Sequence, residues 1–296
     1  MITELEYVVR RGGVPFALRA DKDVKTRNAW HLASVEGNGL PPVSAMGTES
    51  HGVAGQSYEG VSVGAREVEA TMYADGADPA GCQALLSEAS RVFSAGHDAL
   101  GALRLKNAAG EWFRIPAKCL ELEADEHRRR TALCSAVFFC PYAWFESDTL
   151  FSKPLFAVEG GKEYPLERPY DFGGFSSAGL EQTVDVFNPG DVAAPIALHL
   201  FGAGLSSVEV VNETTGAEII VSGMTSAGLE LSTDENDLYA VLADGSDASA
   251  YVSLFSRLSE FKLEPGNNVL TVRMAATSLT AAGTRIEWRG RYSACL

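Results

Sequence analysis

The stretch TRIEWRGRY at residues 284–292 alternates apolar and charged side chains, which is typical of a β-strand with one buried face. Ile286, Trp288 and Tyr292 are expected on one face, with the charged residues between them on the other. Eight similar short segments precede it, at residues 182–187, 195–201, 207–211, 217–221, 229–233, 238–242, 258–263 and 268–274. Turn sequences separate them and no convincing helix interrupts, so this half of the chain is predicted to be a β-sandwich.

The first half of the chain is predicted to be mainly β with one helix. Strands are expected at residues 4–9, 61–63, 67–72, 102–106, 111–115, 120–124 and 131–140. Asp78 is a suitable N-cap, Pro79 suits the first helical position, and Gly96 could close an amphipathic helix between them. The strand at 131–140 is apolar almost throughout, which indicates burial on both faces or cover by a neighbour.

Residues 36–60 hold six glycines and the pair Pro41-Pro42, which predicts a long loop. Loops of this length are usually functional or ordered by a partner, so the segment is expected to reach out of its domain. The predicted organisation is an N-terminal domain at 1–147, a boundary segment rich in aromatic residues at 148–180, and a C-terminal sandwich at 181–296.

The formal net charge is −15, with 24 basic and 39 acidic residues. No Lys or Arg lies between Arg168 and Arg257. A nucleic-acid binder needs cations to displace counterions, so tight DNA binding through that stretch is excluded, and attachment to anionic lipid is disfavoured. No apolar run reaches the ~18–20 residues of a membrane helix, and the N-terminus does not resemble a secretory signal.

The five cysteines form no C-x-x-C pair, and no zinc-ligand spacing is present. Cys134 and Cys140 are expected to be buried thiols, and folding is expected in a reducing cytoplasm. Of the five histidines, His199 is interpreted as a sheet-surface residue rather than a catalytic base, His127 as solvated, and His51 as part of the long loop. Hydrolase, P-loop and metalloprotease motifs are absent. No enzyme is expected, and no catalytic, cofactor-binding or metal-binding residue is assigned.

Four further motifs have competing interpretations. The acidic run 234–237 could hold calcium, but its spacing favours a hairpin turn. The basic run 127–130 could touch phosphate, although solvation or a salt contact to an acidic neighbouring protein is favoured. Asn212 begins a glycosylation pattern that has no meaning without secretion. Trp288 is expected in the core, which leaves no aromatic platform for a sugar.

The order of several motifs resembles the distal tail protein (Dit) family of long, non-contractile-tailed bacteriophages. The motifs are Asn188–Asp191 followed by 194–196, Val210–Gly216, Leu229–Thr233 and Glu264–Asn268, after an N-terminal half that ends in Phe138–Tyr142. The resemblance implies an N-terminal β-sandwich domain, with a helix and a long loop, that forms a homo-hexameric ring. It also implies a C-terminal galectin-like sandwich of jelly-roll type.

In this family the ring joins the tail tube protein to the tail-tip hub at the distal end of the virion's tail, and DNA only passes through it. Many members also carry or brace receptor-binding or side-fibre proteins. A channel wall of acidic or neutral residues is expected, because such a wall would not retain DNA. The alternative function is a carbohydrate-binding module that contacts host glycans.

Overall fold

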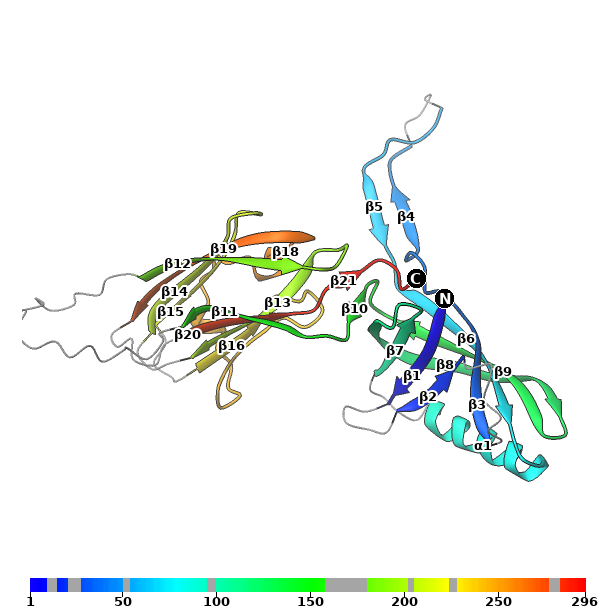
Figure 1. The fold of residues 1–296 in the computed structure, drawn as a ribbon. Helices are drawn as coiled ribbons and strands as arrows, with labels where there is room; N and C mark the ends of the chain where they lie inside the picture. The colour runs from blue at the N-terminus through cyan, green and yellow to red at the C-terminus, as the bar shows by residue number, and fades with distance from the viewer. Residues whose placement is uncertain are drawn as a thin grey trace, which may run out of the picture. The chain divides into compact units, whose positions relative to one another are not determined.

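The structure is a computed structural model that describes residues 1–9, 15–20, 28–49, 54–94, 100–157, 180–201, 205–223, 228–276 and 283–296. The chain forms two compact units (Figure 1). Unit 1 comprises Met1–Asp148 and Tyr292–Leu296, and unit 2 comprises Thr149–Arg291. The last five residues thus lie in unit 1, although the sequence placed them in the C-terminal sandwich. Residues 158–179 of the predicted boundary segment lie outside the described residues.

Unit 1 is built on a nine-stranded sheet. Its order is β21 (Arg291–Tyr292), β10 (Phe145–Ser147), β8 (Trp112–Arg128), β7 (Gly101–Asn107), β1 (Ile2–Val8), β2 (Phe16–Arg19), β3 (Ala29–Glu36), β6 (Arg66–Asp75) and β9 (Thr131–Cys140). The strands β2 and β3 were not predicted. Among the described residues no helix is long and apolar enough to cross a membrane.

Strand β8 closes this sheet on itself. Two separate strands were predicted at 111–115 and 120–124, but the chain stays extended for 17 residues. The first part of β8 pairs with β7, and the part from Lys118 to Arg128 pairs with β9. Irregularities after Cys119 and Ala124 interrupt the second ladder, and such bulges let a strand bend. The two predicted hairpins therefore share one continuous strand.

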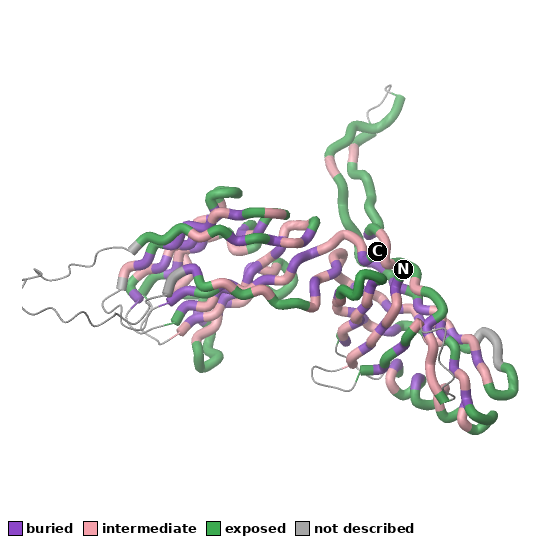
Figure 2. Tube along the Cα trace, viewed as in Figure 1, coloured by how far each residue is buried: buried purple, intermediate pink, exposed green. Residues whose placement is uncertain are grey.

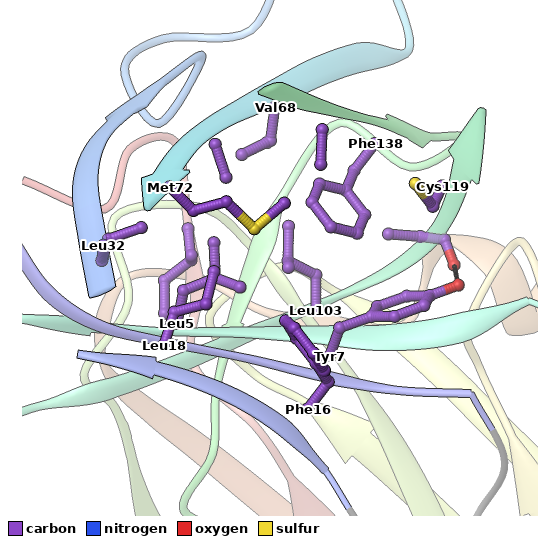
Figure 3. Packing of buried hydrophobic residues seen from close by; sticks show 14 of the residues in the cluster. Leu5, Tyr7, Phe16, Leu18, Leu32, Val68, Met72, Leu103, Cys119 and Phe138 are labelled. Atoms are coloured by element: carbon purple, nitrogen blue, oxygen red, sulfur yellow. Dashed lines mark hydrogen bonds between the residues drawn. The ribbon is translucent and has the colours of Figure 1, made fainter. Parts of the chain in front are cut away.

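The core of unit 1 packs between the strands of the closed sheet (Figure 3). Cys82, Ala89 and Phe93 of the helix α1 (Pro79–Phe93) belong to the same core. The Asp78 side chain accepts a hydrogen bond from the Gly81 amide at 2.7 Å, as predicted for its N-cap. Phe93 packs edge-on against Phe16 with ring centroids 4.8 Å apart. The helix ends at Phe93, and the predicted closing residue Gly96 lies outside the described residues.

Strand β9 is fully buried on one face and half-buried on the other; the prediction was burial on both faces or cover by a neighbour, so full burial of the second face is corrected to partial burial. Its even-numbered residues from Ala132 to Cys140 are buried in the core. Leu133, Val137 and Phe139 point to the outer face and remain half-buried within this chain. The outer face of β9 is therefore unusually apolar for a solvent-facing sheet surface.

The segment 36–60 is more regular than predicted. Strands β4 (Val43–Met46) and β5 (Gly60–Val63) pair antiparallel in a sheet of their own. We call residues 40–63 the ribbon; residues 50–53 at its far end lie outside the described residues. As expected, the ribbon extends away from the nine-stranded sheet of unit 1 (Figure 1).

Unit 2 is a β-sandwich, as predicted, with one core between two sheets. One sheet has the order β11 (Phe151–Ala157), β20 (Gly283–Trp288), β13 (Ala194–Phe201), β16 (Gly228–Ser232) and β17 (Tyr239–Leu242), with β18 (Lys262–Leu263) beside β13. The other has the order β12 (Leu180–Asn188), β19 (Gly266–Ala276), β14 (Leu205–Asn212) and β15 (Ala217–Ser222). Two short 3-10 helices, η1 (Ser249–Tyr251) and η2 (Leu258–Glu260), lie between β17 and β18.

Two strand predictions in unit 2 need correction. The segment 258–263 is the helix η2 followed by the two-residue strand β18. The opening stretch 284–292 is interrupted, because β20 ends at Trp288 and the chain resumes as β21. Ile286 and Trp288 are buried as expected, but Arg291 is buried too, at 4% exposure, instead of sharing a solvent face with Arg285.

Candidate functional site

His199 lies on the outer face of β13, as predicted, while its neighbours Leu198 and Leu200 are buried. Its Nδ1 and Nε2 atoms lie 3.6 Å and 3.5 Å from carboxylate oxygens of Glu230 and Glu287. The Tyr239 hydroxyl donates a hydrogen bond to Glu230 at 2.6 Å. Burial and this bond raise the pKa of Tyr239, so the phenol stays protonated. No hydrogen bond among the described residues links a serine or cysteine side chain to this half-exposed group of His199, glutamates and Tyr239.

The acidic run 234–237 is the turn between β16 and β17, which confirms the hairpin interpretation. Protein cations contact its carboxylates: Arg291 lies 2.6 Å from Asp234 and 3.1 Å from Glu235, and Lys262 lies 2.8 Å from Glu235. Burial tends to raise the pKa of Glu235, but the Lys262 hydrogen bond and the Arg291 charge outweigh it and lower that pKa. Within the described ranges no cluster of His, Cys, Asp and Glu could hold a metal ion.

The structure also locates most of the other residues that the sequence singled out. Asn212 is fully buried, and its amide donates to the Lys262 carbonyl at 2.9 Å, so its side chain organises a turn and is closed to modification. Trp288 is 6% exposed and stacks on Phe151, which confirms its core placement. Arg129 and Arg130 form the tight turn between β8 and β9. His51, His97 and the side chain of His127 lie outside the described residues.

One face of the ribbon is apolar and is left exposed by the described residues. Val43 faces Val63 and Ala45 faces Val61 across the ladder, so these four side chains share one face. Ser44 faces Ser62 on the opposite face. Val43, Val61 and Val63 are 55%, 50% and 37% exposed, and Figure 2 shows exposure along both strands. Leu40 and Tyr58 add exposed apolar surface nearby, at 76% and 74%.

The root of the ribbon, by contrast, is firmly held by Arg66, which is only 2% exposed. Its guanidinium donates hydrogen bonds to the carbonyls of Gly39 at 3.0 Å and Ser293 at 2.9 Å, and a longer one to Gly37 at 3.5 Å. It also lies over the Phe145 ring, 4.3 Å from the centroid. Burial lowers the pKa of Arg66, but an arginine remains charged in proteins. The cation is thus solvated by backbone carbonyls and an aromatic face.

The last five residues, which we call the strap (Tyr292–Leu296), pack on the same root. The Cys295 amide donates to the Asn38 carbonyl at 2.8 Å, and the Asn38 side chain donates back to the Cys295 carbonyl at 2.7 Å. Gly37 lies so close to β6 that an added Cβ would stand 2.0 Å from the Glu67 carbonyl oxygen. The strap, Arg66 and this close approach together set the direction in which the ribbon leaves the sheet.

The sequence did not reveal this root, since its partners are up to 257 positions apart. The signal available was an arginine at the start of a strand whose alternate positions are apolar. Another face of unit 1 carries charges that neutralise one another. Arg104 bonds both Glu6 and Asp148, and Lys106 lies 3.1 Å from Glu4. That face offers less for a partner than the ribbon does.

Comparisons with known proteins find a family for part of the chain and a similar fold for nearly all of it. Residues 190–292 match the model of the siphovirus-type tail component C-terminal domain, SPP1_Dit. No curated protein matches. The crystal structure of SPP1 Dit, described as a paradigm of the hub adsorption apparatus in phages infecting Gram-positive bacteria, has a TM-score of 0.63 and 12% identity, with 98% of this chain and 99% of that one covered.

A second similar structure is the phage p2 baseplate in its activated conformation with Sr, with a TM-score of 0.52, 11% identity, and 96% and 97% of the two chains covered. At these identities the solved structures establish the fold, and the family match rests on unit 2. Residues 190–292 thus match the family of the siphovirus-type tail component C-terminal domain, SPP1_Dit, and the chain over nearly its whole length has a fold similar to that of SPP1 Dit.

Proposed function

We propose that six copies of this chain form a ring at the distal end of a long, non-contractile phage tail. In this role the ring joins the tail tube protein to the tail-tip hub, and DNA passes through its channel without being held. The six-fold ring is implied by the family resemblance, and the similarity to the Dit fold over nearly the whole chain supports it. Unit 2 would face outward, where receptor-binding or side-fibre proteins could attach.

The uncovered ribbon is the observation that favours self-assembly. A two-stranded hairpin is at best marginally stable alone in water, and both its edges offer unpaired backbone groups. Here the face formed by Val43, Val61 and Val63 is also exposed. A two-stranded sheet with unpaired edges and an exposed apolar face, attached at a firmly held base, is typical of an element that another protein chain completes.

The charge of the chain suits a conduit for DNA. The whole chain carries −15, and a negative wall does not capture phosphate. We expect acidic or neutral residues around the channel. Virions assemble from proteins made in the host cytoplasm, where reduced thiols persist; all five cysteines are buried thiols that form no disulfide.

Electron microscopy of the purified full-length chain, combined with light scattering over a concentration series, tests this function. Six-fold rings with a mass of six subunits are expected, either alone or after mixing with the tube and hub proteins. A chain that stays monomeric under all these conditions would contradict the ring. A strongly Arg- and Lys-lined lumen would contradict the proposed passage of DNA through a non-retaining channel.

A further inference from the structure

We propose that the exposed pair Leu254 and Phe255 on unit 2 is a preformed anchor for another protein of the tail. The surface of that partner has an apolar pocket bordered by Lys and Arg side chains. We call residues 253–256 the anchor turn. This inference rests on the tail role proposed above, and it adds the residues by which unit 2 holds a partner and the chemistry of the partner's surface.

The anchor turn exposes two adjacent large apolar side chains. Leu254 is 100% exposed and Phe255 is 82% exposed, and no other large apolar side chain in the described ranges is as exposed as Leu254. The apolar residues on either side point inward, because Val252 and Leu258 pack against the core of unit 2. Single exposed apolar residues are ordinary on protein surfaces, but a contiguous apolar projection marks a contact site.

Hydrogen bonds hold the anchor turn at both ends. The Ser253 amide donates to the Ile220 carbonyl at 2.8 Å, and the Ser256 hydroxyl accepts from the Ile220 amide at 2.8 Å. The Ser256 amide donates to the Ser253 carbonyl at 3.0 Å, which closes the turn. The backbone is thus fixed before a partner arrives. Binding then costs less conformational entropy than it would for a loop that has to be ordered.

The same hydrogen bonds determine how a partner can bind at this place. Strand β15 is the last strand of its sheet, and such an edge can accept an added strand. Here the anchor turn occupies the amide and carbonyl of Ile220, and Val252 forms a bridge with Val221. A partner therefore contacts the side chains of Leu254 and Phe255 instead of extending the sheet. Apolar anchors of this kind fill pockets near the centre of an interface.

The surroundings of the anchor turn are acidic. Residues 180–256 contain 12 acidic residues and no Lys or Arg. Asp244 and Asp247 lie in the segment that leads into the turn, and hydrogen bonds from the serines two residues later lower the pKa of both carboxyls. Both side chains therefore stay ionised at neutral pH. Arg257, just after the turn, lies 3.3 Å from Glu260 and is paired with it.

This charge decides between the possible occupants. An acidic surface is repelled by anionic lipid and by a second copy of the same surface. A pocket with a rim of Lys and Arg side chains is complementary to it in sign, while the floor of the pocket takes up Leu254 and Phe255. The partner is therefore expected to be a different protein chain with a basic rim.

Photo-cross-linking in assembled tails tests the anchor. The full-length chain carrying Phe255→p-benzoylphenylalanine is supplied to a phage that lacks its own copy, and the purified tails are irradiated. We expect a product with one other tail protein, and mass spectrometry should map it to an apolar segment near Lys or Arg. The matched control carries the photoreactive residue at Glu213, an exposed position in the turn between β14 and β15, and should give little product.

The outcomes separate the anchor from the proposed tail role. A product with a second copy of this chain, a product within the same chain, equal products at both positions, or no product would each overturn the anchor. In these cases tails that contain the chain leave the proposed tail role in place. Tails that assemble without the chain would overturn the tail role and the anchor together.

The affinity of the cross-linked partner, once purified, gives a second measure. Phe255→Ser in the full-length chain should weaken binding about 30-fold, as for a central interface residue, and added salt should weaken it further. Leu238→Ser removes another exposed apolar side chain of unit 2, 48% exposed, and should change the affinity about twofold or less. Equal effects of the two substitutions, or binding that strengthens with salt, would overturn the proposal.

Discussion

Arg66→Met tests the claim that a buried arginine fixes the root of the ribbon. Methionine fills much of the same volume but leaves the carbonyls of Gly39 and Ser293 without their donor. Hydrogen bonds to charged groups contribute about 1.5–3 kcal/mol each, so these two amount to about 3–6 kcal/mol. The methionine avoids the cost of burying a cation, which offsets part of that loss and leaves about 2–4 kcal/mol.

Hydrogen exchange followed by mass spectrometry is the suitable assay, because a chain of two units need not unfold in one transition. The lost free energy should make the ribbon root open locally more often. In Arg66→Met the amide of Cys295, which donates to Asn38, should therefore exchange about 30-fold to 1000-fold faster. Peptides from the sandwich core in unit 2, such as β19, should keep their exchange rates.

Arg19→Met is the matched control. Arg19 is also in unit 1, but its side chain is 72% exposed and lies 3.8 Å from Glu4. Surface substitutions of this kind change stability by about 0.5 kcal/mol or less. Unchanged exchange at the strap in Arg66→Met, or an equal effect of Arg19→Met, would refute the role assigned to Arg66.

Three further predictions follow from the same contacts. Deletion of residues 292–296 should loosen the ribbon root as Arg66→Met does, and the double variant should lose less than the sum, as exchange at residues 36–40 will show. Asp78→Ala should destabilise unit 1 by about 1 kcal/mol through loss of the helix N-cap, measured by urea denaturation. The pKa of Glu235 is lowered in the fold, so its ion pair stabilises unit 2 above the ordinary glutamate pKa of about 4.3 and is lost as the pH falls through the lowered value. Glu235→Gln should therefore flatten the acid side of the stability profile of unit 2, and an unchanged profile would contradict this assignment.

Local signals predicted the features that depend on neighbouring residues. The helix followed from Asp78, Pro79 and apolar residues at helical spacing, and the structure places its N-cap there. A turn was expected between the strands predicted at 207–211 and 217–221, and it lies at Asn212–Gly216; the Gly216 amide donates to the Asn212 carbonyl at 2.7 Å, and its φ of 75° suits glycine. These features need no information about distant parts of the chain.

Long-range pairing explains what the sequence did not reveal. Strand β8 was divided in two because Pro116 and the bulge near Glu121 interrupt its alternation, whereas two different partner strands keep it extended. The burial of Arg291 depends on Asp234 and Glu235, more than 50 residues earlier. The apolar outer face of β9 was visible in the sequence, but only the fold shows that this chain leaves that face partly open.

Electron cryomicroscopy of the assembled full-length chain tests the central claim most directly. We predict a six-fold ring in which another protein chain covers the apolar face of each ribbon, with Val43 and Val61 buried. A ring in which every ribbon remains in solvent, or a chain that forms no ring, would contradict the account.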